Sequence, residues 1–217
     1  MLFRSSERRT LEIWRKRRRL QKYGETILSM VQKAFAGNSK IVYHTDYGTL
    51  LGIVREKGFI RHDDDIDFSV YCGTISPKEL HDAMIAAGFS FLRGFRYDGV
   101  VTELAFSYKK VSVDFFYVFT LDGGNYSQVY NAFRSDEDCD RAYFAERLSK
   151  PHLTGIEKIN FKDTVVNIPK NAEDFLRYSY GSGWAVPVKN WTREAGDMKK
   201  RIVLAGCAEI FYTKNDI

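Results

Sequence analysis

The chain has 217 residues, of which 44% are hydrophobic and 15% are aromatic; this composition excludes bulk disorder and is typical of a globular protein. Its length suits one well-buried core better than two independent domains. The net charge of +5 favours polyanionic partners, such as nucleotide phosphates, anionic lipid or nucleic acid.

Residues 5–36 are predicted to form one long helix or two, because apolar side chains recur at helical spacing and Gly37-Asn38 follows as a stop signal. Within this segment Arg15–Arg19 is a solid block of basic residues. Such a block suits peripheral contact with the headgroups of an anionic membrane. A solvated helical face explains it equally well.

Residues 41–44 are predicted to be a short buried strand that leads into a turn at Gly48, and residues 49–55 a helix. A helix start that carries Gly-Thr has free backbone N–H groups and suits a phosphate group. Arg55 is the best candidate for a bidentate pair with that phosphate. The candidates for substrate binding in and after this turn are Asp46, Tyr47, Gly48, Thr49, Arg55 and Lys57.

Four of the five residues from Asp63 to Asp67 are aspartates, and an apolar stretch follows them. In an extended strand Asp63, Asp65 and Asp67 share one face, while Asp64 points to the other. Carboxylates this dense repel one another unless a cation lies among them. The spacing suits Mg²⁺, with Mn²⁺ as the alternative, held by Asp65 and Asp67 together with the phosphates of a nucleotide.

The acidic segment has two alternatives to a magnesium site. A calcium-binding EF-hand loop is excluded, because counting from Asp63 places Phe68 and Thr74 where the loop needs Gly and Glu. A charged edge strand that resists aggregation would involve no chemistry, although such strands rarely need four acids in a row.

Two strands are predicted near residues 100–108 and 111–119, joined by a hairpin turn. The second strand carries Asp114 within an otherwise apolar run. A buried carboxylate is costly unless it meets a cation or hydrogen-bond donors. If this strand lies beside the acidic strand, Asp114 completes a cluster of three carboxylates with Asp65 and Asp67.

The remaining pattern predicts helices over residues 76–87 and 172–180 and a strand over residues 165–169. Residues 122–150, which include the acidic loop 136–138, are interpreted as polar and irregular, and no chemistry is assigned to them. Near the end of the last helix Tyr180, with Tyr178 and Trp184, either walls an organic substrate or packs in the core. Residues 204–212 show no evident role.

The cysteines and the hydropathy bear on the compartment. Cys72, Cys139 and Cys207 are odd in number and far apart, so they predict neither a disulfide framework nor a zinc site. No apolar run approaches the ~20 residues that a membrane-spanning helix needs. The first residues lack the apolar segment of a signal peptide. We therefore expect a cytoplasmic protein, with any membrane contact peripheral at the inner face.

Several stretches resemble the signature of the LicD family, which includes the fukutin-related proteins. They are Asp46–Arg55, Lys57–Ile60, Asp63–Asp67, Val113–Phe116, Ile168-Pro169 and Tyr180-Gly181. The resemblance implies an α+β fold, a nucleotidyltransferase-like mixed β-sheet flanked by helices, here with an N-terminal basic helix. It also implies a catalytic domain over residues 38–217 that follows a basic helical extension over residues 1–37.

The resemblance implies a Mg-dependent phosphotransferase. Its expected partners are a CDP-activated alcohol donor, carrying phosphocholine or else ribitol or glycerol phosphate, and a cell-surface glycan or its lipid-linked precursor; no nucleic acid is expected. Asp65, Asp67 and Asp114 would be the metal ligands and, with Asp63, the catalytic residues, Asp114 acting as ligand, base or both. Two alternatives stay open: transfer of the nucleoside monophosphate itself, and a non-catalytic polyanion-binding protein.

Overall fold

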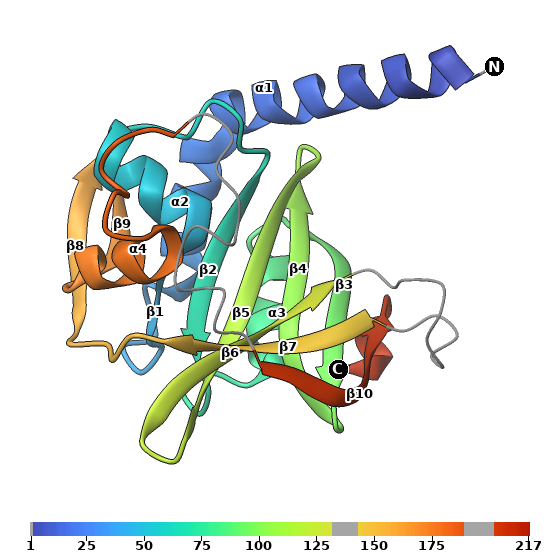
Figure 1. Cartoon of the computed structure of the whole chain (residues 1–217). Coiled ribbons are helices and arrows are strands. Elements are labelled where there is room, and N and C mark those ends of the chain that lie inside the picture. The colour runs from blue at the N-terminus through green and yellow to red at the C-terminus, as the bar shows by residue number, and fades with distance from the viewer. Residues whose placement is uncertain (1, 132–142, 189–201) are drawn as a thin grey trace.

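The computed structural model describes residues 2–131, 143–188 and 202–217 (Figure 1). Its helical elements are α1 (Leu2–Phe35), α2 (Tyr47–Leu51), the π-helical turn η1 (Gly52–Glu56), α3 (Pro77–Ala86), α4 (Ala172–Tyr180) and the 3₁₀ turn η4 (Lys214–Asp216). Its strands are β1 (Tyr43–Thr45), β2 (Asp65–Tyr71), β3 (Ser90–Tyr97), β4 (Val100–Tyr108), β5 (Val111–Leu121), β6 (Gly124–Asn131), β7 (Tyr143–Lys150), β8 (Ile156–Phe161), β9 (Thr164–Pro169) and β10 (Ile202–Phe211).

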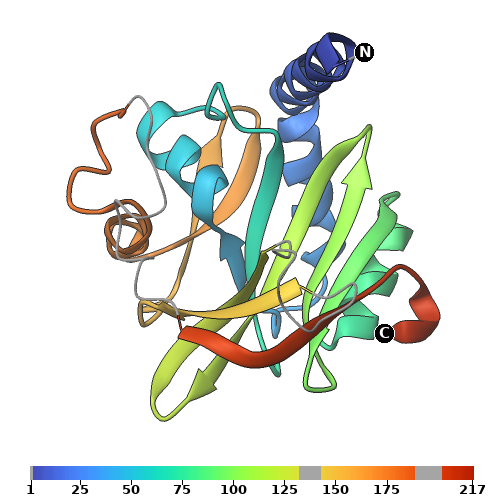
Figure 2. The ribbon, with the colours of Figure 1, turned by 45° about the vertical axis from the view of Figure 1, so that its right-hand side comes forward.

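Within these residues eight strands form one sheet, in the order β1-β2-β5-β4-β3-β10-β7-β6. A further pairing of β5 with β6 curls the sheet back on itself, as Figure 2 shows. β2 and β5 run parallel, whereas the other neighbouring strands are antiparallel. β8 and β9 form a separate hairpin. The α+β class with a mixed sheet and an N-terminal helix is therefore confirmed.

The C-terminal half of α1 packs against β2, β5 and β9 because its apolar residues lie on one side of the helix. Leu20, Ile27 and Val31 are buried there in the main core. A Cβ atom on Gly24 would lie only 2.5 Å from the ring of Phe59, so this close contact requires glycine. This half of α1 thus shares the core of the sheet, while the boundary expected at residue 38 stays a prediction.

The end of α1 before Gly37 and the helix α3 agree with the sequence patterns. Ser76 caps α3: its hydroxyl accepts from the backbone N–H of Glu79, and the Glu79 carboxylate accepts from the backbone N–H of Ser76. α3 buries Leu80 and Met84 against the β3–β4 side of the sheet. In the part of the chain that the structure describes, no helix is both long enough and apolar enough to cross a bilayer.

The interpretation of residues 122–150 as irregular is wrong for the part that the structure describes. That part forms β6 and β7, which pair from Asn125↔Lys150 to Asn131↔Phe144. The strands were missed because polar side chains such as Ser127 and Gln128 are buried in them, so hydropathy does not alternate clearly. β3, β8 and β10 were also not predicted, and β10 joins β3 to β7. The acidic loop 136–138 and Cys139 lie outside the described residues.

Candidate active site

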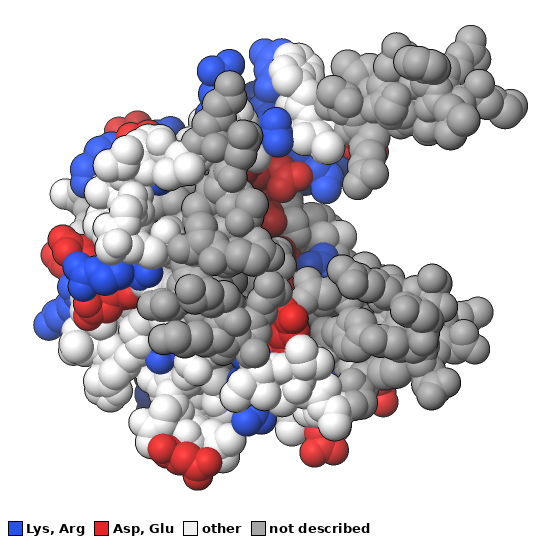
Figure 3. All heavy atoms as spheres, viewed as in Figure 1, with Lys and Arg blue, Asp and Glu red and all other residues white. Residues whose placement is uncertain are grey.

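Three carboxylates meet where β2 and β5 lie side by side. The parallel register pairs Asp67 with Asp114, so their side chains share one face of the sheet with Asp65, two residues earlier in β2. Asp65 and Asp67 are half-buried, Asp114 is buried, and their oxygen atoms lie within 4.8 Å of one another. The convergence expected from the sequence is therefore present. Figure 3 shows acidic side chains inside a hollow on this face, with basic side chains above them.

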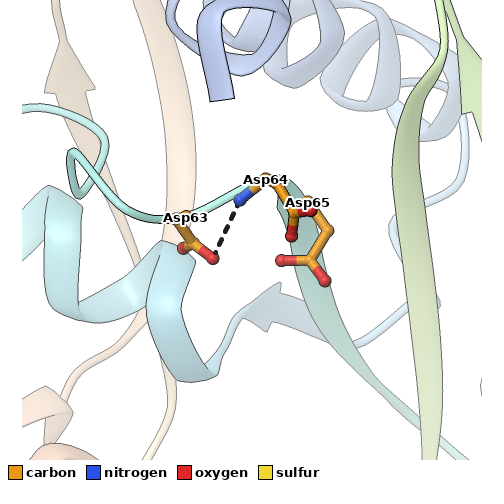
Figure 4. A group of neighbouring side chains, drawn as sticks. All are labelled: Asp63, Asp64 and Asp65. Carbon is orange, nitrogen blue, oxygen red and sulfur yellow. Dashed lines mark hydrogen bonds between the residues drawn. The ribbon is translucent and has the colours of Figure 1, made fainter. Parts of the chain in front are cut away.

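Asp63 and Asp64 extend this cluster along the loop before β2, and Figure 4 shows both beside Asp65. Oxygen atoms of these three side chains also lie within 4.8 Å of one another. Asp63 Oδ1 accepts a hydrogen bond of 3.2 Å from the backbone N–H of Asp64, drawn as the dashed line. On the outer side Asp64 Oδ2 lies 3.8 Å from Lys16 Nζ of α1, an exposed ion pair.

The start of α2 is fixed against the acidic residues. A Cβ atom on Gly48 would lie 2.4 Å from Asp63 Oδ2, so only glycine allows this approach. The buried hydroxyl of Thr49 accepts a hydrogen bond of 3.0 Å from the backbone N–H of Asp67. Gly48 and Thr49 thus position the acidic strand, while the phosphate contact expected of them stays a prediction.

The carboxylates destabilise one another's charged forms. Burial and then the charge of Asp65 raise the pKa of Asp63 to about 8. Burial raises the pKa of Asp67 well above its ordinary value, and Asp65 and Asp114 add to this shift. For Asp114 burial dominates and Arg93 opposes it, leaving a pKa of about 6. Clustered carboxylate oxygens are the ligands that Mg²⁺ or Mn²⁺ prefers, so a divalent cation fits these residues and would relieve the repulsion.

Arg93 of β3 is the nearest described cation to Asp114. Its Nη2 lies 3.6 Å from Asp114 Oδ1 and 3.1 Å from Glu103 Oε1 on β4. Ser112 donates a hydrogen bond of 2.9 Å to the same oxygen of Asp114. Burial and then the charge of Asp114 raise the pKa of Glu103 to about 8, against the effect of Arg93. Neither residue was identified from the sequence, because β3 was not predicted and Glu103 reaches the site only through the β4–β5 pairing.

A cavity of about 420 Å³ opens beside Asp65 and Asp114. It is also lined by Lys16 of α1, by Arg93 and by Lys110 of the β4–β5 turn. Cations therefore surround the side of the cluster that faces this cavity. A neutral or anionic substrate with a hydroxyl group could meet Asp114 here.

Asp46 is held by a buried ion pair that the sequence did not reveal. Its Oδ1 accepts from the backbone N–H of Tyr47 at 2.8 Å, and its Oδ2 accepts from Lys150 Nζ at 2.6 Å and from Ser69 Oγ at 2.5 Å. Lys150 Nζ also lies 3.8 Å from the centroid of the Tyr47 ring. Burial raises the pKa of Asp46, but Lys150 and His44 outweigh it, so the pKa lies below its ordinary value.

Lys150 is the last residue of β7, a strand that the sequence did not predict. The only signal was indirect, since a buried Asp46 requires a cationic or hydrogen-bonding partner. Nothing in the local pattern says which of the chain's basic residues that partner is. The sheet pairing of β6 with β7 brings it there from 104 positions away.

The remaining residues expected to bind substrate lie around the cluster. Arg55 donates from Nη1 to the carbonyl oxygen of Trp184 at 3.0 Å and pairs with Glu56 at 2.7 Å. Lys57 is exposed at the end of η1. Tyr180 ends α4, and burial, then Asp67 and Asp63, raise its pKa well above the ordinary value. Its hydroxyl therefore lies in the field of the acidic cluster.

Comparison with known proteins gives one family. The family model described as LicD/FKTN/FKRP, nucleotidyltransferase domain, matches residues 40–171. The matched range covers more than half of the chain and contains the acidic cluster, Asp46 and Lys150. A search among curated proteins found no match.

Proposed function

The chain belongs to the LicD/FKTN/FKRP family, and from this premise we propose that it moves a phospho-alcohol from a CDP-activated donor to a hydroxyl group of a glycan. Family membership supports a phosphotransferase-type function on glycans in general. The finer proposal is supported above all by the convergence of Asp65, Asp67 and Asp114. Phosphocholine is the proposed cargo, with ribitol or glycerol phosphate as alternatives, and the acceptor is a cell-surface glycan or its lipid-linked precursor.

Asp65, Asp67 and Asp114 would hold Mg²⁺, or Mn²⁺ in its place. When bound, such an ion would neutralise the charge of phosphate oxygens and stabilise the negative charge on the entering and leaving oxygens. Three features of the chain support this assignment: the oxygen-only ligand set, the short separation of the oxygens, and the raised pKa values of the three carboxylates.

The acceptor hydroxyl is proposed to meet Asp114 in the 420 Å³ cavity. The hydroxyl oxygen attacks the phosphorus that bears the alcohol, the bond from this phosphorus to the CMP oxygen breaks, and CMP leaves. Asp114 takes the proton that the hydroxyl loses. Arg93 and Ser112 hold the Asp114 carboxylate in one orientation during this transfer.

Further residues bind and orient the donor. Lys150 and Asp46 fix the turn that carries Tyr47 and Gly48. The turn is therefore proposed to present a preorganised surface to the bound donor. Arg55 and Lys57 are proposed to contact the donor phosphates, and Tyr180 to wall its organic part. The proposed location is cytoplasmic, with Arg15–Arg19 in peripheral contact with the anionic inner face of the membrane.

The test uses CDP-choline and CDP-ribitol that carry the label in the alcohol. With Mg²⁺ and a glycan acceptor, CMP should be released and the label should pass to the glycan. Asp65→Asn should abolish the transfer, whereas Lys158→Asn, an exposed change on β8, should not. If labelled alcohol phosphate is released instead and the CMP group passes to the acceptor, the enzyme transfers the nucleoside monophosphate. Absence of thermal stabilisation by every cytidine nucleotide tested would overturn the donor class.

A further inference from the structure

A second cavity, of about 540 Å³, is lined almost entirely by cations. We call it the basic cavity; its lining residues are Arg18, Arg19, Lys22 and Tyr23 of α1 and Lys109 and Lys110 of the β4–β5 turn. Figures 1 and 2 show the tip of the β4–β5 hairpin close to α1. No carboxylate is among the lining residues, so five basic residues from two distant parts of the chain line one space.

The backbone of the β4–β5 turn gives a second, independent observation. Lys109 and Lys110 have φ angles of 50° and 65°, in the left-handed region that lysine rarely adopts. Two-residue turns of this kind favour Asn-Gly or Asp-Gly. The β3–β4 and β5–β6 turns of this chain follow that preference with Asp98-Gly99 and Asp122-Gly123. The β8–β9 turn also carries a lysine, Lys162, at a φ of 52°, but the β4–β5 turn has lysine at both central positions. Residues held in this region carry backbone strain, which the positive charges of a binding site can justify.

The basic cavity adjoins the candidate active site. Lys110 lines both the basic cavity and the 420 Å³ cavity that contains Asp65 and Asp114. A molecule with an anionic group in the basic cavity can therefore reach Asp114 with a neighbouring group. Like charges that converge without an acid repel one another, and an anion between them removes this repulsion.

We propose that the basic cavity binds a phosphate-ester group, mono- or diphosphate, of the acceptor substrate. The guanidinium groups of Arg18 and Arg19 suit two phosphate oxygens each, and the lysines add compact charges. The assignment of this ester to the acceptor rests on the proposed function, in which the donor diphosphate occupies the acidic cluster. The ester is either the headgroup of a lipid-linked glycan or a soluble glycan phosphate.

The test replaces the turn by its favoured sequence. Lys109→Asn/Lys110→Gly removes two charges and installs the Asn-Gly pair, so the hairpin should fold at least as well, which thermal unfolding checks. The matched control Lys158→Asn/Lys170→Asn removes two exposed charges, one on β8 and one directly after β9. Inorganic pyrophosphate is the probe, in calorimetric titrations at low salt with EDTA. The turn variant should bind it about 10-fold more weakly or worse, and the control within about 2-fold of wild type.

A vesicle assay separates the two sources of the ester. If the ester is a lipid headgroup, vesicles of phosphatidylcholine with phosphatidic acid bind the wild type and the control more tightly than the turn variant. Equal binding by all three reports only the contact through Arg15–Arg19 and argues against a lipid headgroup in the basic cavity. Binding of pyrophosphate alone identifies a soluble phosphate. The proposal is overturned if neither probe binds or if both variants weaken binding equally. Asp65→Asn should abolish transfer without weakening pyrophosphate binding, so failure of the proposed chemistry and failure of this site give different results.

Discussion

Lys150 Nζ lies 2.6 Å from Asp46 Oδ2, and the two side chains are only 2% and 1% exposed. This ion pair ties the end of β7 to Asp46, the residue that caps the start of α2. Because neither charge reaches solvent, each depends on the other: a buried ion that loses its partner keeps the full cost of burial. The pair therefore determines the position of the turn next to the acidic cluster.

Lys150→Met should lower the free energy of unfolding by about 3–5 kcal/mol, because it leaves the Asp46 carboxylate buried without its cation. Urea unfolding measures this change. Lys158→Met, at an exposed position of β8, should change stability by less than about 0.5 kcal/mol. The double variant Asp46→Asn/Lys150→Met should recover part of the loss. Equal stability of the Lys150 and Lys158 variants would contradict the assignment.

Gly48→Ala should impair both folding and transfer, because the new Cβ atom would lie 2.4 Å from Asp63 Oδ2 and must displace it. We expect a loss of about 1–3 kcal/mol in stability and a clear drop in the transfer rate. Gly37→Ala is the matched control, since no atom lies within 4 Å of its Cβ position. Thermal unfolding and the CMP-release assay report the two effects. A Gly48→Ala enzyme with wild-type rate would show that Asp63 can move freely.

The metal-free protein should lose stability as the pH rises. The folded-state pKa values of Asp63 and Asp114, about 8 and about 6, lie above the unfolded value of about 4. These groups therefore contribute stability that is present at low pH and is lost as the pH rises from about 4 to 8. Saturating Mg²⁺ should remove most of this fall. The measurement is urea unfolding across that range, with EDTA or Mg²⁺; a slope that Mg²⁺ does not change would contradict the metal assignment.

Asp114→Asn should separate stability from activity. It removes a buried negative charge from the cluster, so above pH 7 the metal-free variant should be at least as stable as wild type. The same change removes the proposed proton acceptor and metal ligand, so transfer should fall by about 10³-fold or more. Ser107→Ala, which alters another residue lining the same cavity, is the control and should retain most of the activity. Loss of stability together with activity would indicate a structural role for Asp114 instead.

Local sequence patterns were sufficient to predict those site residues whose signal lies within a single strand. The aspartates before and within β2 stand out by their density, and Asp114 by being an acid in an apolar run, and the structure brings them together. Lys150 and Arg93 have no such signal, since each lies on a strand, β7 or β3, that the sequence pattern did not predict and that reaches the site through its pairing with a neighbouring strand. Thr49 shows another limit: a hydroxyl at a helix start suits a phosphate, yet here it also accepts a hydrogen bond from the Asp67 backbone.

The parallel pairing of β2 with β5 also sets the order in which the protein can form. The two strands are joined through α3, β3 and β4, so Asp67 cannot meet Asp114 until this connection has folded. The β4–β5 hairpin, by contrast, closes over a two-residue turn and can form early. A nascent chain should therefore form its local hairpins first, and bring Asp67 beside Asp114 only after β5 has been synthesised and has joined β2.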